Sequence, residues 1–185
     1  MRSLHVLLTA AAVVLGGGLK GQPAPPPRNS VFATFPVPPA SKDLLFYLQR
    51  NKNANTIVYE VGRDASGKLH AEEPVNVNWL RHTEGGIREP LSLMERSIAY
   101  GVSHRHTKEG MATMKFVASE KYPFIVQIRP GGQAEAWISL NGRMARLHHV
   151  YVQAVEGSWR PKVAYVDIYC TDVLTGRPVT EHFIP

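Results

Sequence analysis

The stretch AEAWISLNGRMARLHHVYVQAV, residues 134–155, decides the fold. Two segments typical of β-strands lie on either side of Asn141 and Gly142. Both of these residues accept the positive φ that a type I′ turn requires, so the stretch predicts a β-hairpin. In each strand, successive side chains point to opposite faces of the sheet.

The same kind of segment recurs along the chain, separated by short polar turns. Only Glu89–Ala99 is persuasively helical, with apolar residues at helix-like spacing and a proline suited to the first turn. We therefore expect a mainly β protein, a single antiparallel β-sandwich or barrel of about 8–9 strands with one short helix. The predicted strands are residues 44–50, 56–61, 75–80, 110–118, 123–129, 134–140, 143–155, 162–170 and 178–184.

The N-terminal residues predict where the protein is located. A positive start and the apolar run Leu4–Leu15 resemble a secretory signal peptide, which we assign to residues 1–21. The apolar run is shorter than the about 20 residues of a membrane-spanning helix. Residues 22–40 are rich in proline and predict an extended tether or strap, and residues 41–185 form the β-rich domain. We expect an exported protein, periplasmic or extracellular, with no transmembrane helix after cleavage.

Charge and cysteine usage narrow the function classes. The formal net charge is +6, but lysines and arginines are spread along the chain rather than clustered, so no nucleic-acid surface is indicated. The one cysteine, Cys170, has no partner for an internal disulfide and lies in an apolar run. A buried, unreactive thiol is the expectation there.

The segment VNVNWLRHTEGG, residues 75–86, carries the candidate site. Its polar strand face either meets water or lines a cleft that holds a ligand. In the second case Asn76, Arg81 and Glu84 form a polar cluster, with Trp79 or Trp137 as its apolar wall. This predicts a module that binds a small ligand or an envelope partner. The alternative is that Arg81 and Glu84 close a turn with a surface ion pair.

Two other function classes stay open. A structural or assembly protein would use an exposed strand edge or the proline-rich strap. A metal-dependent hydrolase would need a site such as His104 and His106 on one strand face, completed by His148, His149 or His182. Nothing in the sequence brings these histidines together, and no Gly-x-Ser-x-Gly nucleophile pattern occurs. We predict no cofactor and no metal site, and an enzyme is the minority interpretation.

Four segments together resemble a known family. They are EPVNVNWLRHTEGG, LSLMERSIAYGV, YVQAVEG and PKVAYVDIYCTDVLTGRPVTEHFIP. They are similar to the bacterial domain-of-unknown-function family 4833, from about Phe35 to the C-terminus. The resemblance implies an export signal and brings no activity or cofactor. Trp79, Arg81 and the turn at residues 84–86 match the family pattern, whereas Asn78 stands where the pattern has a bulkier residue.

Overall fold

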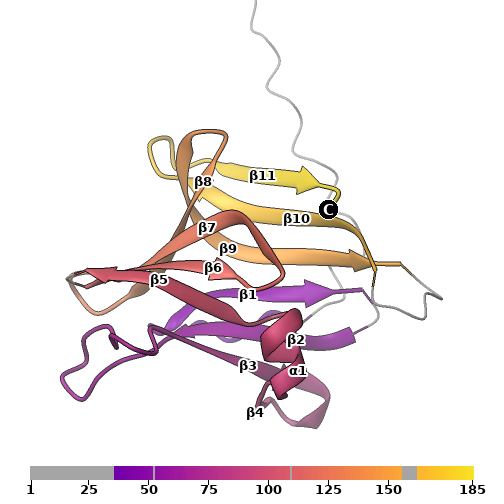
Figure 1. Ribbon diagram of the computed structural model, residues 1–185, viewed down its shortest axis with the longest axis horizontal. Coiled ribbons are helices and arrows are strands. Elements are labelled where there is room, and N and C mark those ends of the chain that lie inside the picture. Colours follow the sequence, from indigo (N-terminus) through magenta and orange to yellow (C-terminus); the bar gives the residue numbers. More distant parts are fainter. Residues whose placement is uncertain (1–35, 52, 109, 156–161) are drawn as a thin grey trace, which may run out of the picture. The chain divides into compact units, whose positions relative to one another are not determined.

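A computed structural model describes residues 36–51, 53–108, 110–155 and 162–185, with only the backbone of residues 105–107. These residues form one sheet of eleven strands and one α-helix (Figure 1). The chain is therefore mainly β, as predicted. The strands are β1 (Leu44–Arg50), β2 (Asn53–Val61), β3 (Val75–Arg81), β4 (Ile87–Pro90), β5 (Val102–Lys108), β6 (Met111–Phe116), β7 (Ser119–Ile128), β8 (Ala134–Leu140), β9 (Arg143–Ala154), β10 (Val163–Asp172) and β11 (Pro178–Phe183).

Strand β9 joins all parts of the sheet. The first half of one of its edges pairs with β8, at Arg143–Arg146, and the second half of that edge pairs with β1, at His149–Val152. Its other edge pairs with β10, which in turn pairs with β11. The sheet thus has two arms, a first arm β1–β4 and a second arm β5–β8, that meet at β9 (Figure 1).

The prediction of an antiparallel sandwich or barrel of 8–9 strands is wrong in its details. The pairing of β1 with β9 is parallel, so the sheet is mixed. The path β4-β3-β2-β1-β9-β8-β7-β6-β5 curls into an open half-barrel, and β10 and β11 extend beyond it. Residues 47–50 and 149–152 are far apart in sequence, so no short turn forces them to be antiparallel, as a hairpin would.

The hairpin of residues 134–155 is confirmed. Asn141 and Gly142 have φ of 50° and 78°, and they connect β8 to β9 in antiparallel register. The helix is shorter than predicted: α1 spans Leu93–Ile98, while Ile87–Pro90 form β4. Ser92 and Glu95 make a reciprocal capping box that fixes the helix start after Pro90.

The core lies between the two arms. Phe46 on β1 stacks on Tyr59 of β2, with ring centroids 4.3 Å apart, and meets Phe124 of β7 edge-on at 5.3 Å. Phe116 of β6 contacts the same group. Each such aromatic pair contributes about 0.5–1.5 kcal/mol beyond its buried area. The curl of the sheet therefore brings the apolar faces of both arms together around these rings.

Little of the N-terminal region is described. Residues 1–35 lie outside the described residues, so the signal peptide and the start of the strap remain predictions. The described end of the strap contacts the domain: Pro38 is buried, and Gln49 Nε2 donates to the Pro36 carbonyl at 2.9 Å. Within the described residues, no helix combines the length and apolar character needed to span a bilayer.

Candidate functional site

The face of β8–β11 that points away from the core is unusually rich in aromatic and polar side chains. We call it the outer face, and it continues onto β1 with Tyr47 and Gln49. Two-residue spacing places its members on one side of each strand. They are Glu135 and Trp137 on β8; Arg146, His148, His149, Tyr151 and Gln153 on β9; Tyr165, Asp167, Tyr169 and Thr171 on β10; and His182 on β11.

A β-bulge places two histidines side by side on the outer face. Tyr169 pairs with His149 and Cys170 pairs with Leu147, so β9 has one extra residue, His148. Leu147 and Val150 on either side both belong to the core. The bulge therefore directs the side chains of His148 and His149 outward and changes the direction of the strand, as bulges near functional sites do.

At the β8 end of the outer face lies a groove of about 290 Å³. Its walls are Glu135, Trp137, Arg146, His148, Thr171 and Asp172, with Val173 and Gly176 at the rim. The Trp137 indole N–H is buried and donates to no described group. A buried donor without an acceptor costs about 1–3 kcal/mol, so a ligand that supplies an acceptor would recover that loss.

Charged groups in the groove are arranged around Glu135. Its carboxylate contacts Arg146 Nη1 at 3.2 Å and Arg129 Nε at 3.6 Å. The Arg129 guanidinium carbon also lies 5.9 Å from the centroid of the Trp137 ring. His148 Nε2 is 2.7 Å from Thr171 Oγ1, and burial, with help from Arg146, lowers the pKa of His148. The groove therefore offers a neutral imidazole, a hydroxyl, an indole and a carboxylate held between two arginines.

Asp167 and His182 are hydrogen-bonded to each other farther along the outer face. His182 Nδ1 lies 2.6 Å from Asp167 Oδ1; the Asp167 side chain is only 11% exposed and that of His182 is 58% exposed. The His182 ring contacts Tyr165, with centroids 5.0 Å apart, and Tyr169 Oη approaches Asp167 Oδ2 at 3.5 Å. A buried carboxylate thus orients an imidazole that faces solvent.

Three stacked rings lie on the outer face between the groove and the contact of Asp167 with His182. Tyr47, His149 and Tyr169 lie nearly parallel across β1, β9 and β10, with successive centroids 5.0 Å and 4.3 Å apart. Burial lowers the pKa of His149 to about 4, so this imidazole is neutral at pH 7. Because the rings cover one another's faces, they present mainly their edges and hydroxyl groups to a ligand.

The structure brings together two of the four predicted site residues. Trp79 is buried in the core at 3% exposure, and the Arg81 guanidinium carbon lies 4.8 Å from its ring centroid. Arg81 Nε donates to Glu89 Oε2 at 2.6 Å, and Trp79 Nε1 donates to Glu95 Oε1 at 3.2 Å. These bonds attach α1 and β4 to the end of the first arm.

The other two predicted residues lie elsewhere. Asn76 is exposed and pairs in register with Glu60, on the opposite face of β3 from Trp79. Glu84 is exposed on the 3₁₀ turn η2 (His82–Glu84), and Arg81 takes Glu89 rather than Glu84 as its ion-pair partner. A ligand role for the four residues stays a prediction, but they do not share one surface.

The histidines and the cysteine have clear surroundings. A bulge interrupts β5 between His104 and His106, so the two-residue alternation assumed for them does not hold. The His106 side chain lies outside the described residues. Within the described part of the chain, no three His, Cys, Asp or Glu residues gather as metal ligands. Cys170 is buried as predicted, and burial raises the pKa of its thiol to about 12.

Sequence reasoning missed the residues at the centre of the outer face. Tyr47 and Gln49, Tyr151 and Gln153, and the series Tyr165, Asp167 and Tyr169 each alternate with apolar residues. Period-two placement of tyrosine with an amide or acid in three separate strands was the available signal. It was hidden because the intervening valines, leucines and isoleucines make these segments read as apolar.

Comparison with known proteins gives one result. The sequence model of a domain of unknown function, DUF4833, matches residues 46–182. No curated protein and no solved structure matches the chain. The match covers every described strand in part or in full, including all the strands that build the outer face.

Proposed function

The chain belongs to the DUF4833 family, and we propose that it is an exported domain that binds a small polar ligand on its outer face. One observation carries the proposal: the groove of about 290 Å³ has a buried indole N–H, from Trp137, that donates to no described group. Small-ligand sites are typically concave, with aromatic walls and a few convergent polar groups. The groove has that composition.

The surroundings of the groove support the same proposal. An ordinary solvated sheet face carries scattered polar side chains with exposed heads. On the outer face, by contrast, Gln49, Tyr151 and Asp167 are each less than 9% exposed. These buried groups are held by partners within the protein: Gln49 Nε2 donates to the Pro36 carbonyl, Tyr151 Oη donates to Gln153 Oε1, and Asp167 accepts from His182. Such an ordered polar surface beside the groove suits a polar ligand.

Ligand-observed NMR tests the proposal. Mixtures of amino acids, sugars, nucleobases and short carboxylic acids are screened against the purified protein. Trp137→Phe keeps an aromatic ring, though a smaller one, and removes the N–H, and Thr171→Val removes the hydroxyl at similar volume. We expect either change to weaken a bound compound by about tenfold, as the loss of one hydrogen bond does.

The matched control is Glu84→Ala, which alters an exposed residue of the first arm. It should leave every hit unchanged. The proposal fails if no compound in the screen gives a saturable signal, or if both groove variants retain the wild-type affinity.

A second candidate function is assembly through a strand edge. The sheet is open, and in the described part of the chain β11 pairs with β10 alone. A free edge can pair with a strand of another chain. Light scattering across a wide concentration range tests this: a mass that rises with concentration favours assembly, and a constant monomer mass removes it.

A further inference from the structure

We propose that Asp167 and the tyrosines around it form a subsite for an organic ammonium group, the cationic end of a small amine. This inference rests on the proposed function, because it names the chemistry of part of the ligand that the outer face would bind. It concerns the region beyond the groove, where Asp167 pairs with His182.

The first argument is the unequal use of the two Asp167 oxygens. The residue is 8% exposed, and Oδ1 receives a close hydrogen bond from His182 at 2.6 Å. Oδ2 has a contact of 3.5 Å with Tyr169 Oη, at the outer limit for a hydrogen bond. A carboxylate oxygen has two lone pairs, and burial makes each unused one costly. An ammonium group would give Oδ2 a short, charge-assisted bond.

The second argument is the chemistry of the neighbours. Tyr165 contacts the His182 ring and lies 6.2 Å from Tyr151, centroid to centroid, while Tyr169 reaches Asp167 directly. Phenol oxygens accept hydrogen bonds from N–H donors. Around one buried carboxylate, these groups suit an organic cation.

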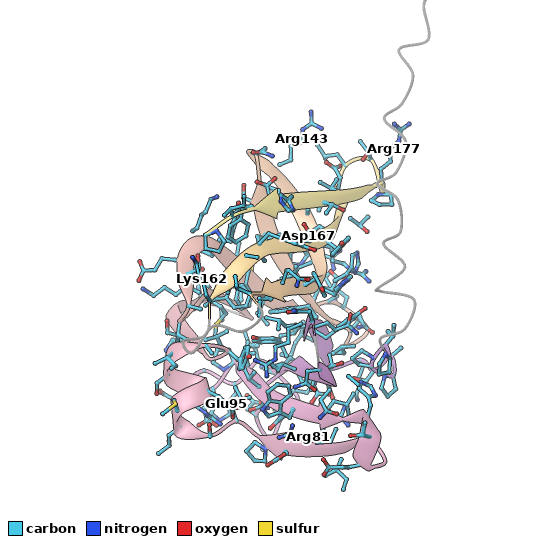
Figure 2. All side chains as sticks on the ribbon, turned by 90° about the vertical axis from the view of Figure 1, so that its right-hand side faces the viewer. Arg81, Glu95, Arg143, Lys162, Asp167 and Arg177 are labelled. Atoms are coloured by element: carbon cyan, nitrogen blue, oxygen red, sulfur yellow. The ribbon has the colours of Figure 1, made fainter. Side chains whose placement is uncertain are left out.

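The local field supports a positive guest. Burial and then the Asp167 charge raise the pKa of Tyr169 to about 12, and burial, Tyr165 and Asp167 raise that of Tyr151. Burial penalises a charge of either sign, but the part of these shifts that comes from Asp167 reflects a negative local potential, which attracts a cation. Figure 2 shows Arg143 and Arg177 at the turn end of the sheet, above Asp167 in this view. Among the described residues, no lysine or arginine side chain forms an ion pair with Asp167.

The coordination chemistry favours an amine over a metal ion. Calcium takes six to eight oxygen ligands, and magnesium requires an octahedral set. Asp167 is the one carboxylate of this cluster, and its Oδ1 is already bonded to His182. An ammonium group needs only three acceptors, and the Asp167 carboxylate and the Tyr169 phenol oxygen lie together here.

The subsite also has a defined distance to the groove. Thr171 of the groove and Asp167 lie four residues apart on β10. At about 3.4 Å per residue their separation is roughly 14 Å along the strand. A ligand with an amine at one end and a hydrogen-bonding group at the other would reach both places.

Three probes of equal length test the charge requirement: n-butylammonium, 1-butanol and butyrate. Binding is followed by NMR titration of the tyrosine and histidine ring signals of the full protein at constant ionic strength. We expect saturable shifts at Tyr165, Tyr169 and His182 with butylammonium, and affinities at least about tenfold lower for the other two probes.

Variants locate the site. Asp167→Asn keeps the shape and an acceptor for His182 but removes the charge, and it should weaken butylammonium by about tenfold or more. Tyr169→Phe should weaken it by a few-fold, and it gives a second readout if Asp167→Asn folds poorly. Glu84→Gln, which removes one negative charge from the first arm, should have no effect.

The inference is overturned if butanol or butyrate binds as well as the amine. It is also overturned if Asp167→Asn binds the amine normally, or if calcium or potassium displaces the amine at low millimolar concentration. Its failure can be distinguished from failure of the proposed function. Compounds that bind more weakly to Trp137→Phe, but show no preference for an amine, would support ligand binding in the groove and refute only the ammonium subsite.

Discussion

Among the residues that the structure describes, two carboxylates accept a hydrogen bond from a ring nitrogen, and they differ in how many further bonds they accept. Glu95 accepts from the Trp79 indole and from both the backbone N–H and the hydroxyl of Ser92. Asp167 accepts one short bond, from His182. Figure 2 shows Glu95 near Arg81 at one end of the molecule and Asp167 toward the other.

The difference separates structural from candidate binding residues. Around Glu95 each partner has a place in the fold: Ser92 begins α1, Trp79 fills the core and Arg81 covers Trp79. A saturated network of this kind stabilises the fold and leaves little for a ligand. Asp167 is more buried and less fully bonded. Spare hydrogen-bonding capacity, rather than polarity alone, therefore distinguishes the outer face.

Replacement of Trp79 with alanine should have the largest effect on stability. The side chain is 3% exposed and contacts Arg50, Arg81 and Tyr100. We expect a loss of about 3–5 kcal/mol in the free energy of unfolding, typical of a large aromatic residue removed from a core. Urea denaturation measures it. A loss below about 1 kcal/mol would contradict the structural role assigned to this end of the molecule.

Glu95→Ala should cost less, about 1–2 kcal/mol, because it removes the capping box and the acceptor of the Trp79 N–H. Glu95→Gln is the matched control, since glutamine can still cap the helix start. In urea denaturation, the glutamine variant should lie between wild type and the alanine variant. Equal stability of all three proteins would show that the network contributes nothing.

The dependence of stability on pH isolates the Glu95 charge. Hydrogen bonds, chiefly from the Ser92 backbone N–H, hold the pKa of Glu95 below its usual value. A depressed folded-state pKa adds stability above the unfolded pKa of about 4.3, and that stability is lost as pH falls through the folded value. Urea midpoints measured from pH 6 to pH 3 should thus fall more steeply for wild type than for Glu95→Gln. Parallel curves would refute the assignment.

Asp167→Asn should change stability by less than about 1 kcal/mol, because asparagine keeps the shape and an acceptor for His182. Thermal or urea unfolding measures this, and the amine titration measures binding in the same sample. A large loss of stability would place Asp167 with Glu95, as a structural carboxylate, and would erase the contrast between the two regions.

Glu84→Ala should have the smallest effect, under about 0.5 kcal/mol, because the side chain is exposed and Arg81 pairs with Glu89 instead. Arg81→Ala is the informative companion, since it uncovers Trp79 and should destabilise more. If the Glu84 and Arg81 variants lost equal stability in urea, the two residues would belong to one unit, as the sequence first indicated.

Local sequence patterns predicted local structure well. Asn141 and Gly142 predicted the β8–β9 turn, and alternation placed most strands and their apolar faces. Three features escaped prediction for physical reasons. The β1–β9 pair has no connecting turn, the bulge at His148 depends on its partner strand, and β4 is an exposed four-residue strand with no alternation to detect.

In the candidate site, too, local sequence patterns predicted some residues, and others depended on contacts between distant strands. Trp79 and Arg81 were found because a tryptophan and an arginine stand out in a polar segment, and they do contact each other. Asp167 was overlooked because its neighbours Val166 and Ile168 are apolar. Its importance comes from His182 on the adjacent strand and from Tyr151 across the ladder, contacts that only the three-dimensional register supplies.

The parallel ladder between β1 and β9 has a kinetic consequence. It links Tyr47 to His149, so about a hundred residues must be closed into a loop before those hydrogen bonds form. Contacts of such long range slow folding. A chain that appears N-terminus first, from a ribosome or a translocation pore, would hold β1 paired with β2 alone until β9 emerges. One edge of β1 therefore stays unpaired during that time, and a chaperone that recognises unpaired strand edges could bind it.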